Sequence, residues 1–337
     1  MHSSNPSAPN ALVGNGILNF ARTPDVERLL ANVYKWQIES TVLSRPEGIN
    51  QGGTLRLAAL GVSSNYLTSA VRTRGAVPRG HISLGFDNGY RPGRRFAGHD
   101  LQGEDVVVGY DGAELDYLTP AGFRGLTFTL PGHLVAQALE LRGAPPEALH
   151  GFSSIVSGRM DRAGFPAVRG LVDQMVDFLQ SPHPGGGPQA ALSFLQAAIV
   201  DASAEVVAAI ASRASEDRRA FWHHRRPVVR AAEEFMRANT GEPIMLHQIC
   251  QAARASERTV EYAFRGFYGM GAKKYLKLLR LNRVRDELLR AGSYGAAIQD
   301  VAWRAGFWHM GRFSSDYRRL FGERPTDTRA RSRDRWH

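Results

Sequence analysis

Two segments of the chain place arginine, glutamate, histidine and serine side chains on the outer face of short predicted helices. The first runs from Ile249 to Gly269 and the second from Gly306 to Pro325. In each, a short apolar helix is followed by a tight turn and then by a helix that mixes aromatic residues with outward polar groups. Such side chains can form hydrogen bonds with base edges in a DNA major groove. The pattern therefore predicts two helix-turn-helix units.

The second helix of the first unit has one apolar and one polar face. Ser256 is its expected N-cap, and Val260, Phe264 and Phe267 are assigned to the core. Arg258 is the leading candidate for base contact, with a solvated helix face as the alternative. Glutamates on this face repel phosphate. They fit a face that contacts DNA only if they accept hydrogen bonds from cytosine amino groups or orient the arginine. The residues assigned to base contact are Glu257, Arg258, Glu261 and Tyr262, and Arg265 is assigned to phosphate.

The second unit repeats this division between core and outer face. Gly306 permits the turn, and Phe313, Tyr317 and Phe321 are expected to face inward. His309 is equally well explained as a helix cap, and Asp316 is expected to pair with a neighbouring arginine. The residues assigned to base contact are His309, Met310, Arg312 and Ser315, and those assigned to phosphate are Arg318 and Arg319.

A long basic helix is predicted between the two units, over residues 273–290. Its apolar stripe consists of Tyr275, Leu278, Leu281, Val284 and Leu288. Lys273 and Lys274, at its start, are assigned to phosphate contact.

The charge of the chain is concentrated at its C-terminal end. Residues 218–337 hold 25 Lys and Arg against 12 Asp and Glu, and the remaining residues hold 17 against 20. A basic third joined to a slightly acidic remainder is typical of a polyanion-binding domain attached to a second domain. Charge alone does not separate DNA from RNA or from anionic lipid.

The N-terminal half reads as short strands between turn residues. Residues 54–57, 81–86 and 126–130 alternate apolar and polar side chains, and turn formers such as 91–93, 110–112 and 119–122 separate them. This spacing predicts a β-sandwich or small barrel. After Pro131 the pattern becomes helical, with Leu134, Ala138 and Leu141 on one face.

The expected organisation has six parts. They are a disordered tail (1–20), a β-rich regulatory domain (21–150), a helical segment (151–215), a linker (216–227), a DNA-binding domain (228–328) and a basic tail (329–337). There are two interpretations of the apolar positions in residues 169–213, among them Leu171, Met175 and Phe178. They either close the core of the β-rich domain or form a homodimer contact.

Several classes of protein are disfavoured by the residues. The single cysteine, Cys250, excludes an internal disulfide and a cysteine-cluster zinc site. His81, His99, His133 and His150 stand apart, without the His-x-His pairing typical of a metal-binding barrel. No nucleophile and base are arranged for catalysis, so the prediction is a non-enzyme without cofactor or metal. The sequence has no apolar stretch of 18 or more residues that would indicate a membrane span. A cytoplasmic location is expected.

The C-terminal hundred residues, about 228–328, resemble the AraC/XylS family of bacterial transcription regulators. The shared motifs are Arg280-Leu281-Asn282 on the linker helix, Asp300-Val301-Ala302 followed by Gly306-Phe307, and Phe321-Gly322 followed by Pro325. Residues 308–313 look closest to regulators of ethanolamine-utilisation operons. At Gly271-Ala272 the chain departs from the Ser-Pro that often opens the family's linker helix. Ala272 starts a helix as well, so the departure costs little.

The resemblance implies an α+β protein, with a cupin-like or barrel-like β-rich domain and trailing helices before an all-α domain of two helix-turn-helix motifs. It implies double-stranded DNA and RNA polymerase as partners, and a linker helix that sets the recognition helices about one DNA turn apart. One monomer then reads two successive major grooves, and the DNA usually bends to meet both.

Two functional classes remain open for the whole chain. The first is an activator that responds to a small-molecule effector, and the second is a regulator controlled by a protein partner or by dimerisation alone. Aromatic residues of the β-rich half either line an effector pocket or pack a core: Tyr66, His81, Phe86, Tyr110, Tyr117 and Phe128. A group of arginines favours an anionic ligand, although solvated turns explain them better: Arg72, Arg74, Arg79, Arg94 and Arg95.

Overall fold

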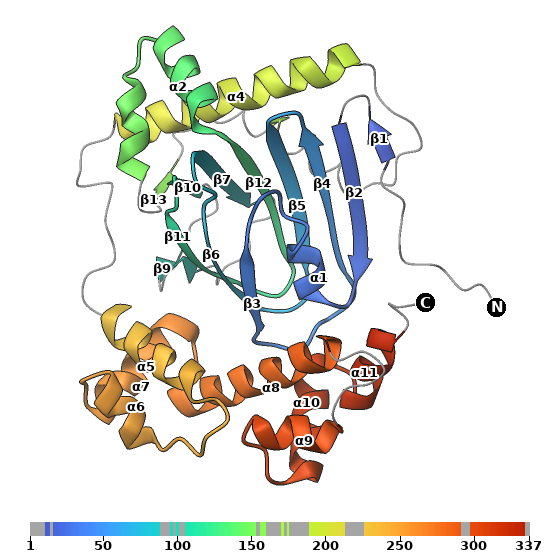
Figure 1. The fold of residues 1–337 in the computed structure, drawn as a ribbon. Coiled ribbons are helices and arrows are strands. Elements are labelled where there is room, and N and C mark those ends of the chain that lie inside the picture. The colour runs from blue at the N-terminus through green and yellow to red at the C-terminus, as the bar shows by residue number, and fades with distance from the viewer. Residues whose placement is uncertain are drawn as a thin grey trace, which may run out of the picture.

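The chain forms a β-rich N-terminal domain and an all-helical C-terminal domain in a computed structural model (Figure 1). The structure describes residues 11–13, 16–87, 95–96, 99–100, 105–152, 156–159, 170–171, 174, 189–212, 226–290 and 297–333. The predicted α+β class, with strands before helix-turn-helix units, is confirmed.

The larger of two sheets has eight antiparallel strands in the order β1-β2-β4-β5-β12-β7-β10-β13. Its strands are Ala11–Val13 (β1), Gly16–Thr23 (β2), Asn50–Leu57 (β4), Leu60–Leu67 (β5), His81–Asp87 (β7), Asp105–Tyr110 (β10), Phe123–Pro131 (β12) and Val156–Arg159 (β13). Two domain predictions need correction. The predicted disordered tail over 1–20 is too long, because β2 pairs with β4 along its whole length. The segment over 151–215 is not purely helical, because β13 pairs with β10.

The smaller sheet has five strands in the order β3-β6-β11-β8-β9. They are Ile38–Val42 (β3), Val71–Ala76 (β6), Arg95–Phe96 (β8), His99–Asp100 (β9) and Glu114–Thr119 (β11), and helix α1 (Val26–Leu30) precedes them. A cavity of about 120 Å³ lies between the two sheets. Both apolar and hydroxyl side chains line it, including Trp36, Thr73, Ser83, Tyr117, Phe123 and Thr127.

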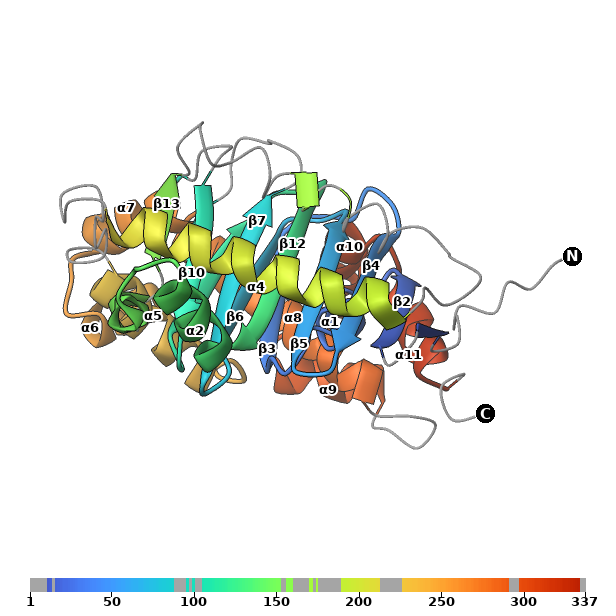
Figure 2. The ribbon, with the colours of Figure 1, turned by 90° about the horizontal axis from the view of Figure 1, so that it is seen from above.

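Helices cover the outer face of the larger sheet (Figure 2). They are α2 (Gly132–Leu141), the 3-10 helix η1 (Pro146–Phe152) and α4 (Gln189–Ala211). Alternate strand residues such as Val62, Leu84 and Phe128 are fully buried in one apolar cluster with these helices. On α2 the buried face is Val135 and Leu139, whereas Leu141 is 90% exposed. The predicted apolar face of this helix is therefore wrong by one position.

Helix α4 is long and apolar enough to cross a membrane by length and composition, over Ser193–Ala211. The core helix of a soluble protein passes the same test. Its residues Ile199, Ala204 and Val207 are fully buried in the core between this helix and the larger sheet. Asp201 on the same helix forms an ion pair of 2.7 Å with Arg142, beside the end of α2. These contacts are those of a helix that closes a domain core.

Seven helices form the C-terminal domain as described. They are α5 (Arg226–Ala238), α6 (Leu246–Ala252), α7 (Glu257–Tyr268), α8 (Ala272–Arg290), α9 (Ile298–Arg304), α10 (Met310–Phe321) and α11 (Pro325–Arg333). The predicted apolar stripe of the linker helix, now α8, is buried, as are Val260, Phe264, Phe313 and Tyr317. The helix-turn-helix pairs are α6–α7 and α9–α10.

Helix α8 packs against strand β3, and so joins the two domains (Figure 1). Asn282 of α8 binds the backbone of Val42 twice. Its side-chain oxygen accepts from the Val42 N–H at 2.8 Å, and its amide group donates to the Val42 carbonyl at 2.9 Å. An apolar cluster runs without a break from α1 and β3 into α8. The linker helix therefore belongs to the core of both domains.

Candidate nucleic-acid interface

The first recognition helix, α7, begins at the predicted N-cap residue and ends at a glycine. The Ser256 side chain accepts from the Thr259 N–H at 3.2 Å, which is an N-cap bond. At the other end Gly269 takes the left-handed conformation, with φ of 68°, and its N–H donates to the Arg265 carbonyl. A left-handed C-cap favours glycine, because a Cβ is strained there. These caps fix the length and direction of the helix.

The outer face of α7 is exposed as predicted. Glu257, Arg258, Tyr262 and Arg265 are exposed, and Tyr262 is 60% accessible. Glu261 is different, because its carboxylate accepts from the Ala272 N–H at 3.2 Å and so caps α8. This negative group stabilises the positive N-terminal end of the linker helix. Base contact by Glu261 stays a prediction that competes with this capping bond.

The second recognition helix, α10, starts at Met310 with His309 in the N-cap position. The His309 side chain makes no capping hydrogen bond, so capping does not explain this residue. His309, Arg312, Ser315, Arg318 and Arg319 are exposed, whereas Met310 is half-buried against the core. Gly311 lies in the first turn of α10 and not in its middle. A glycine there costs less free energy than one in a helix interior.

Asp316 pairs with a neighbouring arginine, as predicted, and also with a lysine. Its carboxylate lies 3.2 Å from Lys277 of α8 and 3.5 Å from Arg319. Only 11% of the Asp316 side chain is exposed. These ion pairs tie the recognition helix to the linker helix and hold Arg319 at the edge of the outer face. Lys273 and Lys274, at the start of α8, are both exposed.

Two basic residues beside α10 were missed from the sequence. Arg324 precedes α11, and Arg45 comes from the loop after β3 in the N-terminal domain. Both line one groove with Arg318 and Arg319. The position of Arg324 before Pro325 was a usable signal, because a proline often opens a helix. No sequence pattern places Arg45 there, since it lies more than 250 residues away in the chain.

Comparison with known proteins agrees with this geometry. Residues 249–331 match the family model described as HTH_18, a helix-turn-helix domain. The chain is 30% identical over 118 residues to a probable thc operon regulatory protein of Rhodococcus erythropolis, which is 34% of this chain and 36% of that protein. The C-terminal domain is a helix-turn-helix domain of the AraC type.

Other relatives align with the same AraC-type domain. A XylDLEGF operon transcriptional activator of Pseudomonas putida is 30% identical over 103 residues, which is 31% of each chain. A solved AraC-type regulator from Chromobacterium violaceum is 32% identical and has a TM-score of 0.30, with 32% of this chain and 92% of that chain covered. This chain thus spans about a third of the length of the first two relatives. These relatives are transcription regulators and not enzymes, in agreement with the predicted non-enzyme.

Buried ion pairs join the AraC-type domain to the smaller sheet. Arg72 of β6 is 2% exposed and donates to Asp116 at 2.7 and 2.8 Å. It also donates to Glu233 of α5 and, at 2.5 Å, to the Tyr275 hydroxyl of α8. Burial would raise the pKa of Glu233, but the guanidinium groups of Arg72 and Arg237 offset it and hold the pKa at about 2. The expectation that Arg72 lies in a solvated turn is therefore wrong.

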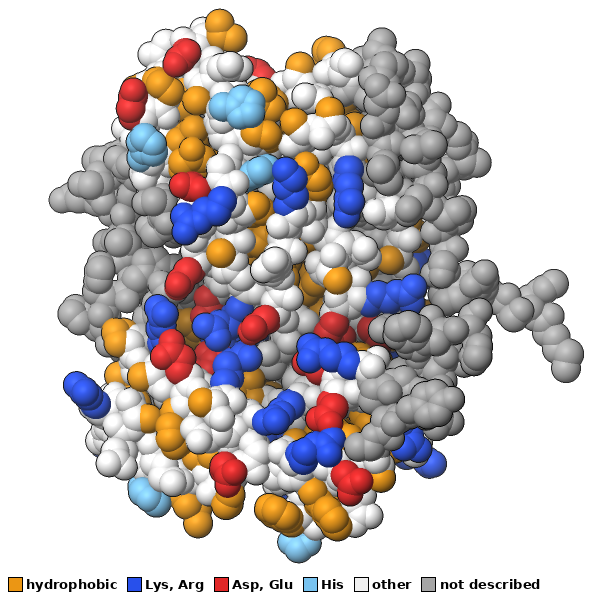
Figure 3. All heavy atoms as spheres, in the orientation of Figure 1, with side chains coloured by type: hydrophobic (Ala, Val, Ile, Leu, Met, Phe, Trp, Pro, Cys, Tyr) orange, Lys and Arg blue, Asp and Glu red, His pale blue; other side chains and the backbone are white. Residues whose placement is uncertain are grey.

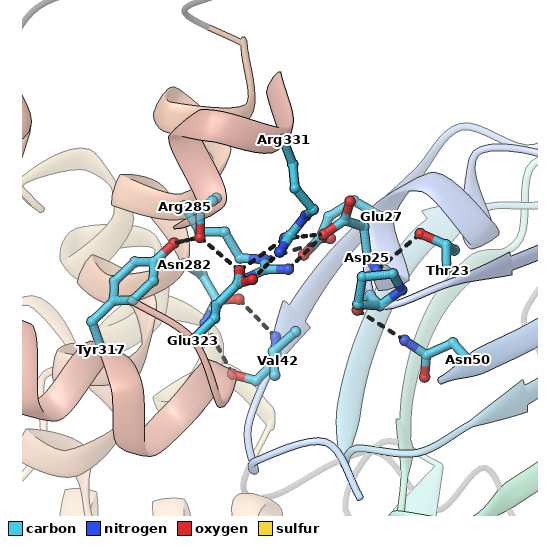
Figure 4. Close-up of polar contacts among 12 residues, drawn as sticks. Thr23, Asp25, Glu27, Val42, Asn50, Asn282, Arg285, Tyr317, Glu323 and Arg331 are labelled. Atoms are coloured by element: carbon cyan, nitrogen blue, oxygen red, sulfur yellow. Dashed lines mark hydrogen bonds and ion pairs between the residues drawn. The ribbon is translucent and has the colours of Figure 1, made fainter. Parts of the chain in front are cut away.

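A second ionic cluster joins α1 to α8 and α11 (Figure 4). Arg285 of α8 lies 2.6 Å from Asp25 and 2.5 Å from Glu323. Arg331 of α11 donates to the same two carboxylates, at 2.9 Å to Asp25. Figure 3 shows acidic and basic side chains intermixed along the seam between the domains. The β-rich domain and the second half of the AraC-type domain are therefore held together by charge as well as by apolar contact.

Asp286 of α8 has a pKa well above its usual range. Burial, and then the neighbouring carboxylate of Glu27, raise the pKa of Asp286 to about 7, although Arg290 and Arg285 act in the opposite direction. Below pH 7 the folded protein therefore holds a proton that the unfolded chain has already lost. Its contribution to stability is lost as the pH rises through 7.

We expect the free energy of unfolding to fall by about 1.4 kcal/mol between pH 6 and pH 8 on account of Asp286. Urea denaturation of the wild type and of Asp286→Asn at both pH values measures this difference. The substitution should remove that part of the pH dependence, and Glu287→Gln on the same helix should not. An unchanged pH profile in Asp286→Asn would contradict the expectation.

Proposed function

We propose that the protein is a transcription regulator that binds a specific DNA sequence through both recognition helices of its AraC-type domain. The observation that carries the proposal is the outer face of each helix, which stays exposed with arginines while the N-terminal domain is docked. The 19 residues of α8 span about 28 Å, at 1.5 Å per residue. This length is close to the ~34 Å of one DNA turn and supports contact with two successive major grooves.

The proposal assigns different tasks to Arg258 and Lys273. Arg258 reads a base, so Arg258→Ala should cost about 1–3 kcal/mol on the target site and relax one base preference. Lys273 contacts phosphate, so Lys273→Ala should weaken binding to all sequences about evenly. Selection from a random duplex pool, followed by binding titrations on the selected site and on single-base variants, measures both effects.

Arg312 and Lys274 form the matched pair for the second recognition helix. Arg312→Ala should change preference at a different base pair from Arg258→Ala, and Lys274→Ala should resemble Lys273→Ala. If Arg258→Ala lowers affinity equally for all sequences, its assignment to a base is wrong. If no sequence is enriched by the wild type, sequence-specific binding itself is wrong.

For the N-terminal domain we propose a small-molecule effector, held in the cavity between the two sheets, that controls transcription activation with RNA polymerase. Phe86 and Tyr117 line this cavity, whereas Phe128 faces the helices on the other side of the larger sheet. A cavity of roughly 150 Å³ holds a benzene-sized ligand, so a compact effector fits best. Thermal stabilisation of the whole protein by compounds from a metabolite panel tests this assignment. The effect of a hit should be lost in Ser83→Leu, which fills the cavity.

The second candidate is control by dimerisation or by a protein partner, without an effector. Phe194 of α4 is 78% exposed, beside the buried face that packs on α2, and supports a homodimer contact. Of the three positions singled out earlier, Leu171 is half-buried, and Met175 and Phe178 lie outside the described residues. Sedimentation at tens of micromolar, with Phe194→Ser as the variant, tests the dimer.

The target operon and the location in the cell belong to the proposal as well. The relatives named above regulate thc and XylDLEGF operons, so they lend no support to an ethanolamine-utilisation target. A regulator of this kind acts on bacterial DNA, and we therefore place it in the cytoplasm. A reporter driven by the site selected in vitro tests activation in cells.

A further inference from the structure

A basic groove crosses the boundary between the two domains beside the second recognition helix. It has a volume of about 580 Å³. Four arginines line it, and no carboxylate does: Arg45, Arg318, Arg319 and Arg324, together with Ile298, Ser314, Ser315, Pro325 and Thr326. Three of the four come from α10 and the residue before α11, and the fourth comes from the β-rich domain. The groove therefore has one wall that the DNA-binding domain does not supply.

Three of these guanidinium groups are free to take an anion. Within the described part of the chain, Arg45, Arg318 and Arg324 make no ion pair, and Arg319 pairs at 3.5 Å with Asp316. The other carboxylates nearby are engaged: Asp327 accepts from the Arg324 N–H at 2.9 Å, and Glu323 binds Arg285 and Arg331. Glu47 is exposed on the same loop as Arg45. Phosphate oxygens match such a set of unpaired arginines.

The groove lies at the edge of the surface assigned to DNA. Ser315 and Arg319 belong both to the outer face of α10 and to the lining of the groove. The N-terminal end of α11 begins at Pro325 and Thr326, where the helix dipole favours a negative charge, and Asp327 lies in its first turn. The groove is therefore placed to receive DNA backbone next to a major groove that α10 enters.

Arg45 is positioned by the docking of the two domains. It comes three residues after Val42, whose backbone is bound by Asn282 of α8. Its Nε lies 3.6 Å from the position that a Cβ would take on Gly322, the left-handed C-cap of α10. Arg45 therefore reaches the groove only while β3 and α8 stay paired.

We propose that Arg45 of the N-terminal domain binds the DNA backbone that flanks the site read by α10. The inference rests on the proposed function, since it requires that α10 enters a major groove. It gives the docked β-rich domain a direct part in DNA affinity. A change in docking then alters the affinity by moving one phosphate contact, without any change in the recognition helices.

The test uses the full chain and duplex DNA of two lengths. Arg45→Ala should weaken binding about three- to tenfold at 100 mM salt, equally on target and unrelated sequences. It should also reduce the slope of log affinity against log salt by about 0.9, the value expected for one phosphate contact. Arg45→Lys should keep the slope. Arg56→Ala removes the same charge from an exposed site on β4 and should leave both quantities unchanged.

The DNA length provides the second measurement. On a duplex cut at the edge of the site read by α10, wild type and Arg45→Ala should bind equally. The inference would be overturned if Arg45→Ala kept the wild-type slope of log affinity against log salt. It would also be overturned if Arg45→Ala lost the same affinity on both duplexes. An unchanged slope would mean that Arg45 makes no phosphate contact. An equal loss on both duplexes would mean that Arg45 acts through domain docking. Failure of the wild type to bind any DNA would instead overturn the proposed function, so the two failures are distinguishable.

Discussion

Arg72→Ala is expected to lower the free energy of unfolding by about 3–5 kcal/mol. The change leaves Asp116 in a buried seam without a cation, and it leaves Glu233 with Arg237 at 2.8 Å and the more exposed Arg74. An unpaired buried charge costs far more than a lost surface ion pair. Arg72 also lies over the Tyr268 ring at 4.8 Å, so a packing contact is lost as well. Urea denaturation gives the free energy.

Arg74 provides the matched control on the same strand. It lies 3.7 Å from Glu233 but is 31% exposed, so Arg74→Ala should cost less than about 1 kcal/mol. Because Arg72 and Glu233 act together, Arg72→Ala with Glu233→Ala should cost less than the two single changes added. X-ray scattering should show a larger radius of gyration in Arg72→Ala, as the domains separate. A loss of under 1 kcal/mol in Arg72→Ala would mean that the cluster does not hold the domains together.

The helices of the C-terminal domain were predictable because their signals are local. Ser256, Gly269 and Gly322 mark helix ends by their own chemistry, and Phe264 and Phe313 recur on core faces at helical spacing. Core assignments for α7, α8 and α10 followed from that spacing alone. The outer faces were predicted in the same way, because a residue of an amphipathic helix that does not point into the core is exposed.

The contacts between domains were not predictable, because they join residues far apart in the chain. Arg72 meets Glu233 across 161 positions, and Asp25 meets Arg331 across 306. In the sequence Arg72 resembles any arginine near a turn, and only the packing of β6 against α5 shows that it is buried. Asn282 was visible as part of a family motif, but its bond to Val42 depends on the docked sheet. The first strands were missed because residues 1–20 begin with a polar, proline-rich stretch.

The affinity of the whole protein for DNA should depend steeply on salt. Seven cations are assigned to phosphate or line the basic groove beside α10: Arg45, Arg265, Lys273, Lys274, Arg318, Arg319 and Arg324. Each phosphate that is neutralised releases counterions, with a slope near −0.9 per contact. Raising the salt from 50 to 200 mM should therefore weaken binding on the order of 10³-fold or more. Fluorescence anisotropy with a labelled duplex over this range measures the slope.

A substitution at one exposed cation tests whether the slope of log affinity against log salt reports the number of phosphate contacts. Arg265 is 73% exposed and lies 3.8 Å from Glu261, so Arg265→Ala should leave the fold intact. Its slope should be shallower by about 0.9, and Arg265→Lys should restore it. The same loss should appear on target and unrelated DNA, because phosphate contacts carry no sequence information. An affinity that stays flat between low and moderate salt would count against a polyanion partner. The concentration of charge in residues 218–337, with 25 basic against 12 acidic side chains, would then need another explanation.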